Sequence, residues 1–283
     1  MIFSISINGK TCLSIKNGVL NALETSVKTA EKPSETARVS AIYTVMKTQI
    51  ERYEALKDEK AVASYSNVGV EKVFADAKKD FEIDPCNVWN TAQKLEILKS
   101  YITLEDFPSQ AKFNARMLWD KQYVYIGFCV YDDLIAPFEG SNVFEGNRPL
   151  MRTDGTRVES YTETYIGGNM LNMSEYYGYF SGIFLKRNAE FYKNRGTPAT
   201  IERPENYKEI FVAHYNEEPS KRYYFHVQAI SLKDLGVTWQ DAKPYGSFVY
   251  YTDRYGRAGW KGNGLWCKDS FSEFVLKDKQ IVR

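Results

Sequence analysis

Two glutamates and two histidines are the residues of this chain best suited to acid–base chemistry. Glu159 and Glu163 share one face of a segment with strand-like alternation, so four residues at about 3.3 Å each would separate them by about 13 Å. That separation exceeds the spacing of carboxylate pairs in glycosidases. His214 and His226 occur without an HExxH motif, and His226 lies in a strand pattern that favours a structural role. We therefore expect no enzyme, although a carboxylate elsewhere that pairs with Glu159 stays open.

Other motifs with a chemical mechanism are absent from the sequence. It contains no GxSxG, P-loop or dinucleotide-binding fingerprint. Cys12, Cys86, Cys129 and Cys267 are scattered without a close pair, which favours free buried thiols over a zinc or redox motif. No cofactor is predicted to be required.

Composition and charge restrict the class of protein. The 283 residues are 43% hydrophobic with a formal net charge of +1, so the chain lacks the basic field that attracts nucleic acid or anionic membranes. The residues after Met1 have neither the basic nor the apolar region of a signal peptide, and no stretch approaches the roughly 20 apolar residues of a membrane span. We expect no nucleic-acid or membrane partner, and the location stays open. The 21 tyrosines suit either a β-rich core or a stacking surface.

Residues 113–131 form the most strongly patterned segment and predict a β-hairpin. Apolar residues alternate with polar ones before a polar turn at Asp120-Lys121-Gln122. In the second strand both alternating sets, residues 124–130 and residues 123–131, are apolar or aromatic. One face can then enter a sandwich core while the other meets a second layer or a ligand.

Residues 1–83 are expected to form an attachment region. Residues 2–15 alternate around Asn8-Gly9, a strong signal for a two-residue hairpin. A helical stripe begins at Val19, and further helices fit 34–53 and 70–81. Because so few elements make a thin core, the apolar stripe of the long helix either packs within this region or docks onto a protein partner.

Residues 84–283 have the pattern of a mainly β domain. Strands are predicted near 158–165, 222–230, 246–252 and 271–276, separated by Gly, Asn, Asp and Pro. The segments 134–156 and 186–209 are predicted to be long loops with room for a binding rim. The expected fold is an antiparallel, jelly-roll-like β-sandwich preceded by a small hairpin and a helical region.

The order of motifs over residues 84–278 resembles the family-nine carbohydrate-binding modules, which have a DOMON-like β-sandwich. Val88-Trp89-Asn90 stands near the domain start, and WDKQYVYIGFCVYDD at 119–133 resembles the family pattern WDxxYLYVxxxVxDD. Val158-Glu159 stands where the family has its VEIF strand. Segments at 230–236, 251–253, 256–260 and 265–274 follow in the family's order. The resemblance implies a sandwich that binds glycans without cleaving them and grips a terminal sugar between aromatic side chains.

The resemblance also implies individual roles. Trp266 matches a stacking tryptophan, Asn263 a polar sugar contact, and Glu159 a glutamate that hydrogen-bonds sugar hydroxyls. An exposed indole can cover the apolar C–H face of a pyranose, while carboxylate and amide groups bond its hydroxyls. Trp266 as ordinary core and Glu159 as an exposed strand residue remain alternatives. Trp260 corresponds to a core tryptophan.

The chain departs from the family on the other side of the sugar. It has no tryptophan shortly before Val158, where Phe144 is the available substitute, and the family's sugar-binding arginine is replaced within 179–182. Relatives often hold structural calcium, for which Asp132, Asp133 and Asp253 offer oxygen ligands. Solvated turn aspartates are the alternative for these three residues.

Together these patterns predict non-catalytic binding of a glycan or polysaccharide by a module displayed on a larger assembly. The alternative is a structural or assembly protein, such as a capsid, decoration or tail-associated component of a bacteriophage virion, that uses the sandwich as a scaffold. In either case a protein partner is expected to bind through residues 1–83, and an oligomer or virion or cell-surface display is compatible with this arrangement.

Overall fold

The computed structural model divides the chain into two compact units, Met1–Glu59 and Lys60–Arg283. It describes residues 2–7, 10–16, 19–22, 60–80, 84–97, 111–132, 143–144, 160–171, 177–183, 190–193, 200–214, 218, 221–252, 256–260 and 271–279. No helix in this part of the chain is both long and apolar enough to cross a membrane.

The first unit contains a three-stranded antiparallel sheet. Its strands are β1 (Ile2–Ile7), β2 (Lys10–Lys16) and β3 (Val19–Ala22), in that spatial order. The register pairs Ile7 with Lys10, which confirms the predicted two-residue hairpin. The helix predicted to start at Val19 is wrong over 19–22, because this segment pairs with the free edge of β2; four residues are too few for periodicity to distinguish a helix from a strand. The helix predicted over 34–53 lies outside the described residues.

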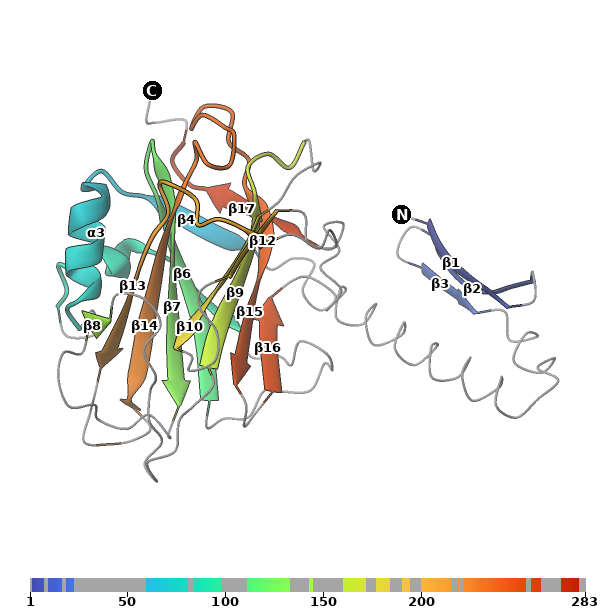
Figure 1. The fold of residues 1–283 in the computed structure, drawn as a ribbon, viewed down its shortest axis with the longest axis horizontal. Coiled ribbons are helices and arrows are strands. Elements are labelled where there is room, and N and C mark those ends of the chain that lie inside the picture. The colour runs from blue at the N-terminus through green and yellow to red at the C-terminus, as the bar shows by residue number, and fades with distance from the viewer. Residues whose placement is uncertain are drawn as a thin grey trace. The chain divides into compact units, whose positions relative to one another are not determined.

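The second unit is a continuous 14-stranded sheet that folds over on itself (Figure 1). One layer follows the order β12 (Thr200–Ile201), β11 (Glu190–Lys193), β10 (Tyr177–Ile183), β9 (Ser160–Gly167) and β15 (Tyr245–Thr252), with β16 (Gly256–Trp260) also paired to β15. The chain of pairings then passes through β17 (Ser272–Leu276) and β4 (Ala61–Tyr65). The other layer continues with β6 (Ala111–Trp119), β7 (Tyr123–Asp132), β14 (Tyr223–Ser231), β13 (Lys208–His214) and β8 (Val143–Phe144), and β5 (Lys94–Ile97) pairs with β6.

Side-chain contacts show that the two layers face each other. Strands β9 and β14 are not neighbours in the sheet, yet Thr162 Oγ1 lies 2.7 Å from His226 Nδ1 and Thr164 Oγ1 lies 2.6 Å from Gln228 Oε1. The mainly β sandwich is therefore confirmed. The pairings between its described strands are antiparallel except those of β4, which runs parallel to both β17 and β6.

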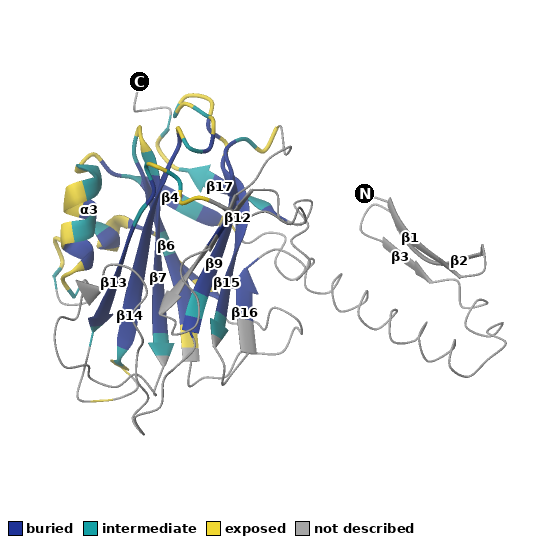
Figure 2. Ribbon diagram, in the orientation of Figure 1, coloured by how far each residue is buried: buried dark blue, intermediate teal, exposed yellow. Residues whose placement is uncertain are grey.

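Strand β7 packs on both of its faces, which is one of the two arrangements that its sequence allowed. Val124, Ile126, Phe128 and Val130 enter the core between the layers. Tyr125 and Cys129 enter a second apolar cluster, which also contains residues of helix α3 (Gly69–Ala77) and of the short 3₁₀ helix at Val88–Thr91. Figure 1 shows α3 beside β13 and β14, and Figure 2 shows that these two strands are mostly buried. The second face of the hairpin is thus covered by a helical layer.

Trp89 anchors this helical layer. Its Nε1 donates a hydrogen bond to the carbonyl oxygen of Val73 at 3.1 Å, and its ring meets Phe225 edge-on at 4.9 Å between centroids. Both the predicted hairpin at 113–131 and the predicted helix near 70–81 are confirmed by this arrangement, although α3 ends at Ala77.

Two sequence expectations differ from the observed fold. The segments 134–156 and 186–209 are not simple loops, because they contain β8, β11, β12 and the start of β13. The boundary between the units lies after Glu59, earlier than the predicted boundary after 83. The reason is that β4 inserts between β17 and β6, so residues 61–77 belong to the sandwich.

The cysteine prediction is correct for one of the two described thiols. Cys129 is buried, whereas Cys86 is free but exposed. Cys86 lies in the turn before the 3₁₀ helix, where its backbone N–H donates to Asp84 Oδ1 at 2.9 Å. Cys12 and Cys267 have no described side chains.

Candidate functional site

Most residues predicted to bind sugar or calcium lie outside the described part of the chain. This is true of Trp266, Asn263, Glu159, Asp133 and Asp253. Asp132 ends β7, and its side chain is not described. Among the described residues, no group of three or more His, Cys, Asp or Glu side chains is arranged to hold a metal ion. The assignments of these residues stay predictions.

Phe144 belongs to the layer that does not contain β9. It lies in β8 and is paired with Phe211 of β13 at the edge of that layer. The strand that follows Glu159 is in the opposite layer.

Strand β9 presents two different faces. Thr162 and Thr164 contact β14 in the interior, so the alternation of the strand turns Tyr161, Glu163 and Tyr165 to the other side of the layer. Tyr161 is paired in register with Tyr251 of β15. Their ring centroids are 4.8 Å apart with an interplanar angle of 35°, and both side chains are half-buried. We call Tyr161 and Tyr251 the tyrosine pair.

Glu163 follows the tyrosine pair on the same face but is hidden from solvent. Glu163 is only 4% exposed, and its Oε2 accepts a hydrogen bond from Tyr165 Oη at 2.7 Å. Val249 is its register partner on β15. Glu163 is therefore part of the packed structure beneath this face.

His226 has the structural role expected from the sequence. It is 0% exposed, its Nε2 lies 3.2 Å from Glu209 Oε2, and its ring stacks on Phe211 at 4.0 Å. Burial lowers the pKa of His226, and the nearby Glu209 opposes this shift. Trp260 is likewise core, being 1% exposed and stacked on Phe248.

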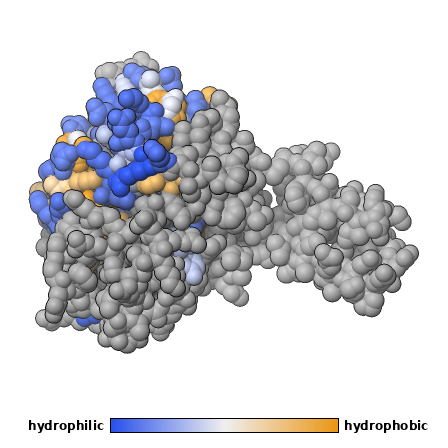
Figure 3. All heavy atoms as spheres, viewed as in Figure 1, coloured by the Kyte–Doolittle hydropathy of each residue, from blue (hydrophilic) through white to orange (hydrophobic). Residues whose placement is uncertain are grey.

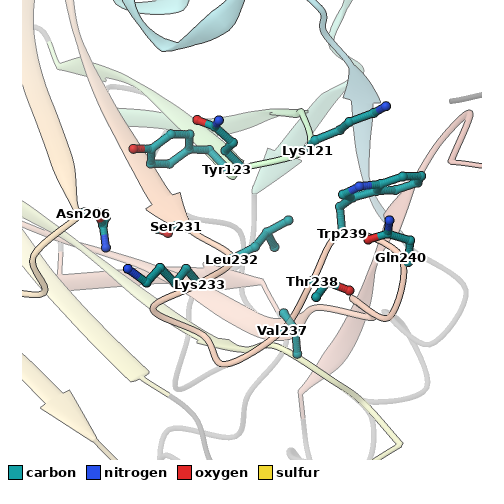
Figure 4. A pocket seen from close by; sticks show the side chains of 11 residues that line it. Lys121, Tyr123, Asn206, Ser231, Leu232, Lys233, Val237, Thr238, Trp239 and Gln240 are labelled. Carbon is teal, nitrogen blue, oxygen red and sulfur yellow. The ribbon is translucent and has the colours of Figure 1, made fainter. Parts of the chain in front are cut away.

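A hollow with a volume of about 500 Å³ lies at the end of the sandwich that carries the β6–β7 turn (Figure 4). We call it the Trp239 hollow. It is lined by Lys121, Gln122, Tyr123, Asn206, Ser231, Leu232, Lys233, Val237, Thr238, Trp239 and Gln240. Lys121 Nζ lies 5.0 Å from the centroid of the Trp239 ring, within the range of a cation–π contact.

Hydrogen bonds hold the walls of the Trp239 hollow in place. Asp120 Oδ1 accepts from the backbone N–H groups of Gln122 and Tyr123, each at 2.7 Å, which shapes the β6–β7 turn. Burial and the hydrogen bond to Asp120 raise the pKa of Tyr125, whose Oη donates to Asp120 Oδ2 at 2.5 Å. The backbone N–H of Leu232 donates to Gln122 O at 2.8 Å and ties the end of β14 to the turn.

Solved structures that are similar to this chain include the following three. One is a protein from Bacteroides uniformis, provisionally described as carbohydrate-binding, with 11% identity, a TM-score of 0.47, and 77% of this chain and 98% of that chain covered. The other two are structures of a carbohydrate-binding module from Caldicellulosiruptor kristjanssonii, one in complex with cellotriose and one in complex with glucose. Both are family 9 carbohydrate-binding modules. Their identities are 14% and 15%, their TM-scores 0.42 and 0.41, and the coverage is 77% of this chain against 94% and 96% of theirs. No family model matches the sequence, and no curated protein matches it either.

No pattern in the sequence indicates the Trp239 hollow. Its side chains come from residues 121–123, from Asn206 and from 231–240, which are distant in the chain. The nearest sequence signals were the polar turn at 120–122 and the segment 230–236, but neither pattern indicates that Trp239 joins them.

Proposed function

We propose that the unit Lys60–Arg283 binds glycans on the outer face of β9 and β15 and does not cleave them. The tyrosine pair carries this proposal, because two adjacent, half-buried rings on a sheet face offer a surface for the apolar C–H side of a sugar. Glu159 directly precedes β9, the strand that bears Tyr161. Its carboxylate would bond sugar hydroxyls at the end of this surface.

Trp266 and Asn263 are proposed to complete the same site. An indole would supply a second stacking surface, and an amide would bond hydroxyls at the edge of the sugar. Phe144 is proposed to contact only a ligand long enough to reach the edge of the other layer, where β8 lies.

Among the described residues, the acid–base candidates Glu163 and His226 are poorly placed for catalysis. A glycosidase needs an acid that can exchange protons with the bound sugar. Glu163 is 4% exposed and His226 0% exposed, and both side chains are hydrogen-bonded within the packed structure. These groups therefore suit a structural role.

A glycan-array screen of the full chain tests the proposal. We expect at least one glycan to bind, and we expect Trp266→Ala to lose that binding while the midpoint of urea unfolding stays unchanged. Screens with and without calcium test whether Asp132, Asp133 and Asp253 hold the ion. If no glycan binds at high protein density, or if Trp266→Ala binds as well as the natural chain, the proposal is wrong.

A second candidate function is attachment to a larger assembly, such as a virion or a cell-surface array. It is favoured by the separate compact unit Met1–Glu59, whose sheet has β1 and β3 as its outer strands within the described order. Edge strands offer backbone groups to which a partner strand can pair. Sedimentation of the full chain, compared with a chain that starts at Lys60, should show larger species for the full chain alone. Equal monomeric behaviour would argue against self-assembly through this unit.

A further inference from the structure

We propose that the Trp239 hollow is a second ligand site and that it takes a sugar bearing a carboxylate group. This inference does not depend on the glycan site at the tyrosine pair. It rests on the position, shape, charge and rigidity of the hollow.

The two sites lie at opposite ends of the sandwich. In the contact between β9 and β14, Ser160 meets Tyr224, and Thr164 meets Gln228. The start of β9, next to Tyr161, is therefore near the start of β14, whereas Ser231 at the other end of β14 lines the hollow. A ligand in the hollow is consequently separate from one on the tyrosine pair.

The shape and lining of the hollow suit a sugar ring. Its volume of about 500 Å³ is within the range of small-molecule sites. Trp239, Leu232 and Val237 form apolar surface, and the indole is half-buried. Asn206, Gln122 and Gln240 bring amide groups that can both donate to and accept from hydroxyls. Apolar surface edged by amides is the combination that a pyranose requires.

Charge selects an acidic sugar over a neutral one. Lys121 and Lys233 both line the hollow, and none of its described lining residues is acidic. In Figure 4 Lys121 lies near Trp239, while Lys233 lies on the other side of Leu232 near Asn206. An ammonium group pairs strongly with a carboxylate. A sugar ring that lies against Trp239 can place its carboxylate beside Lys121.

Two further carboxylates, besides Asp120 in the β6–β7 turn, accept hydrogen bonds from residues that line the hollow. Asp234 accepts hydrogen bonds from the backbone and the side chain of Asn206, at 3.2 and 2.8 Å. Asp241 accepts one from Thr238 Oγ1 at 2.7 Å. Oxygens of these two acids are already engaged with lining residues, so they do not compete directly with a ligand carboxylate for Lys121.

Backbone hydrogen bonds fix the conformation of the segment that carries Trp239 without any ligand. The N–H of Val237 donates to Leu232 O at 3.0 Å, and the N–H of Ala242 donates to Thr238 O at 2.9 Å. Gly236 has φ +72°, a conformation that favours glycine, and it turns the chain within the loop that the first of these bonds closes. A preformed wall reduces the entropy that a ligand loses on binding.

The surface seen in Figure 3 is mostly hydrophilic at the end of the sandwich that carries the Trp239 hollow, as expected for a site that binds a polar ligand. The described residues at the end where the β14–β15 connection lies are mostly hydrophilic, with isolated hydrophobic residues among them. A neighbouring hollow of about 520 Å³ shares Lys233, Val237 and Thr238 with the first. A bound sugar therefore has room to continue into a second residue of an oligosaccharide.

Isothermal titration of the full chain with methyl glucuronide and methyl glucoside tests the inference, because the two probes differ only in the carboxylate. We expect the glucuronide to bind at least about tenfold more tightly, since hydrogen bonds to charged groups contribute more than neutral ones. Lys121→Gln should weaken glucuronide binding by about tenfold, and Trp239→Ala should abolish it. Added salt should weaken it as well.

Matched variants distinguish binding in the Trp239 hollow from binding elsewhere on the surface of the chain. Lys112→Gln removes an exposed lysine near the opposite end of β6, paired with Tyr131, and should leave affinity unchanged. Tyr251→Ala should also leave glucuronide binding intact, whatever it does to neutral glycans. Equal binding of both probes, no binding of the glucuronide, or a loss in Tyr251→Ala or Lys112→Gln as large as that in Lys121→Gln would overturn the inference.

Discussion

Thr162 Oγ1 and His226 Nδ1 lie 2.7 Å apart and join β9 to β14 through the interior of the sandwich. The other ring nitrogen of His226 lies 3.2 Å from Glu209 Oε2, which also accepts a hydrogen bond from Tyr207 Oη at 2.8 Å. Burial raises the pKa of Tyr207, and the adjacent Glu209 adds to this effect. The imidazole is therefore part of a buried polar connection between the two layers.

The lowered pKa of His226 predicts a stability that decreases in mild acid. The unfolded chain protonates this histidine near its ordinary pKa of 6.5, whereas the folded chain does so at lower pH. The unfolded state thus binds more protons between these values, and the free energy of unfolding should fall as pH drops below 6.5. Urea titrations from about pH 8 to about pH 5 measure this slope. His226→Gln should flatten it, and an unchanged slope in that variant would exclude His226 as the cause.

Asp76→Asn should loosen the helical layer. Burial raises the pKa of Asp76, but hydrogen bonds from Lys72 and the Val88 N–H, together with the charges of Lys72 and Lys79, outweigh burial and hold it below its ordinary value. The amide would lose charge-assisted bonds at a residue 1% exposed, so we expect a loss of about 1–3 kcal/mol in unfolding free energy. The loss should be present at neutral pH and shrink as pH falls below 3.8, where the carboxylate of the natural chain protonates.

Denaturation of both proteins at pH 7 checks the Asp76 prediction, with Glu218→Gln as the control. Glu218 forms an exposed ion pair with Lys221 at 3.0 Å, and such pairs contribute little. Equal losses in the two variants would contradict a special role for Asp76.

Gly127→Ala should destabilise the sandwich by overpacking. A Cβ atom at this position would lie 2.5 Å from the ring of Phe225 and 2.8 Å from that of Trp89. Both rings are buried and meet edge-on, so neither can move freely. We expect a loss of about 1–3 kcal/mol in the free energy of unfolding.

Gly69→Ala is the matched comparison for the glycine prediction. This glycine has φ +76° and nothing within 4 Å of an added Cβ, so the loss there should be confined to about 1–2 kcal/mol of backbone strain. Far-ultraviolet dichroism and urea titration compare the two variants. A Gly127→Ala protein as stable as the natural chain would show that the Trp89–Phe225 pair can adjust.

Tyr251→Ala should weaken binding of any glycan that the array identifies by about tenfold or more, because it removes one of two adjacent stacking rings. Tyr251→Phe should retain most of the affinity if stacking dominates. Titration calorimetry provides the measurement. Leu171→Ala, at a side chain 77% exposed, is the control for nonspecific loss. Full affinity in Tyr251→Ala would remove the tyrosine pair from the site.

Local patterns in the sequence were sufficient for several elements of the fold. The alternation at 113–131 predicted β6 and β7 and a core position for one face of β7; of the two alternatives for the other face, a second layer or a ligand, the structure shows the second layer. Asn8-Gly9 predicted the β1–β2 hairpin. These predictions succeed because neighbouring strands and two-residue turns depend on residues close together in the chain.

Local patterns failed where distant segments compete for the same backbone groups. Val19–Ala22 has the apolar content of a helix start, but the free edge of β2 takes it as a strand. The short segment 61–65 pairs with β17 and with β6, and both of these strands are distant from it in the sequence. A segment of four or five residues has little periodicity of its own, so the available partner decides its structure.

The sequence by itself determined the fold class, the hairpins and the structural role expected for His226. Only the tertiary structure decided that Thr162 and His226 meet, that Tyr161 lies beside Tyr251, and that Lys121, Asn206 and Trp239 line one hollow. The physical reason is that alternation is a property of one strand, whereas these contacts depend on the register and folding-over of strands separated by dozens of residues.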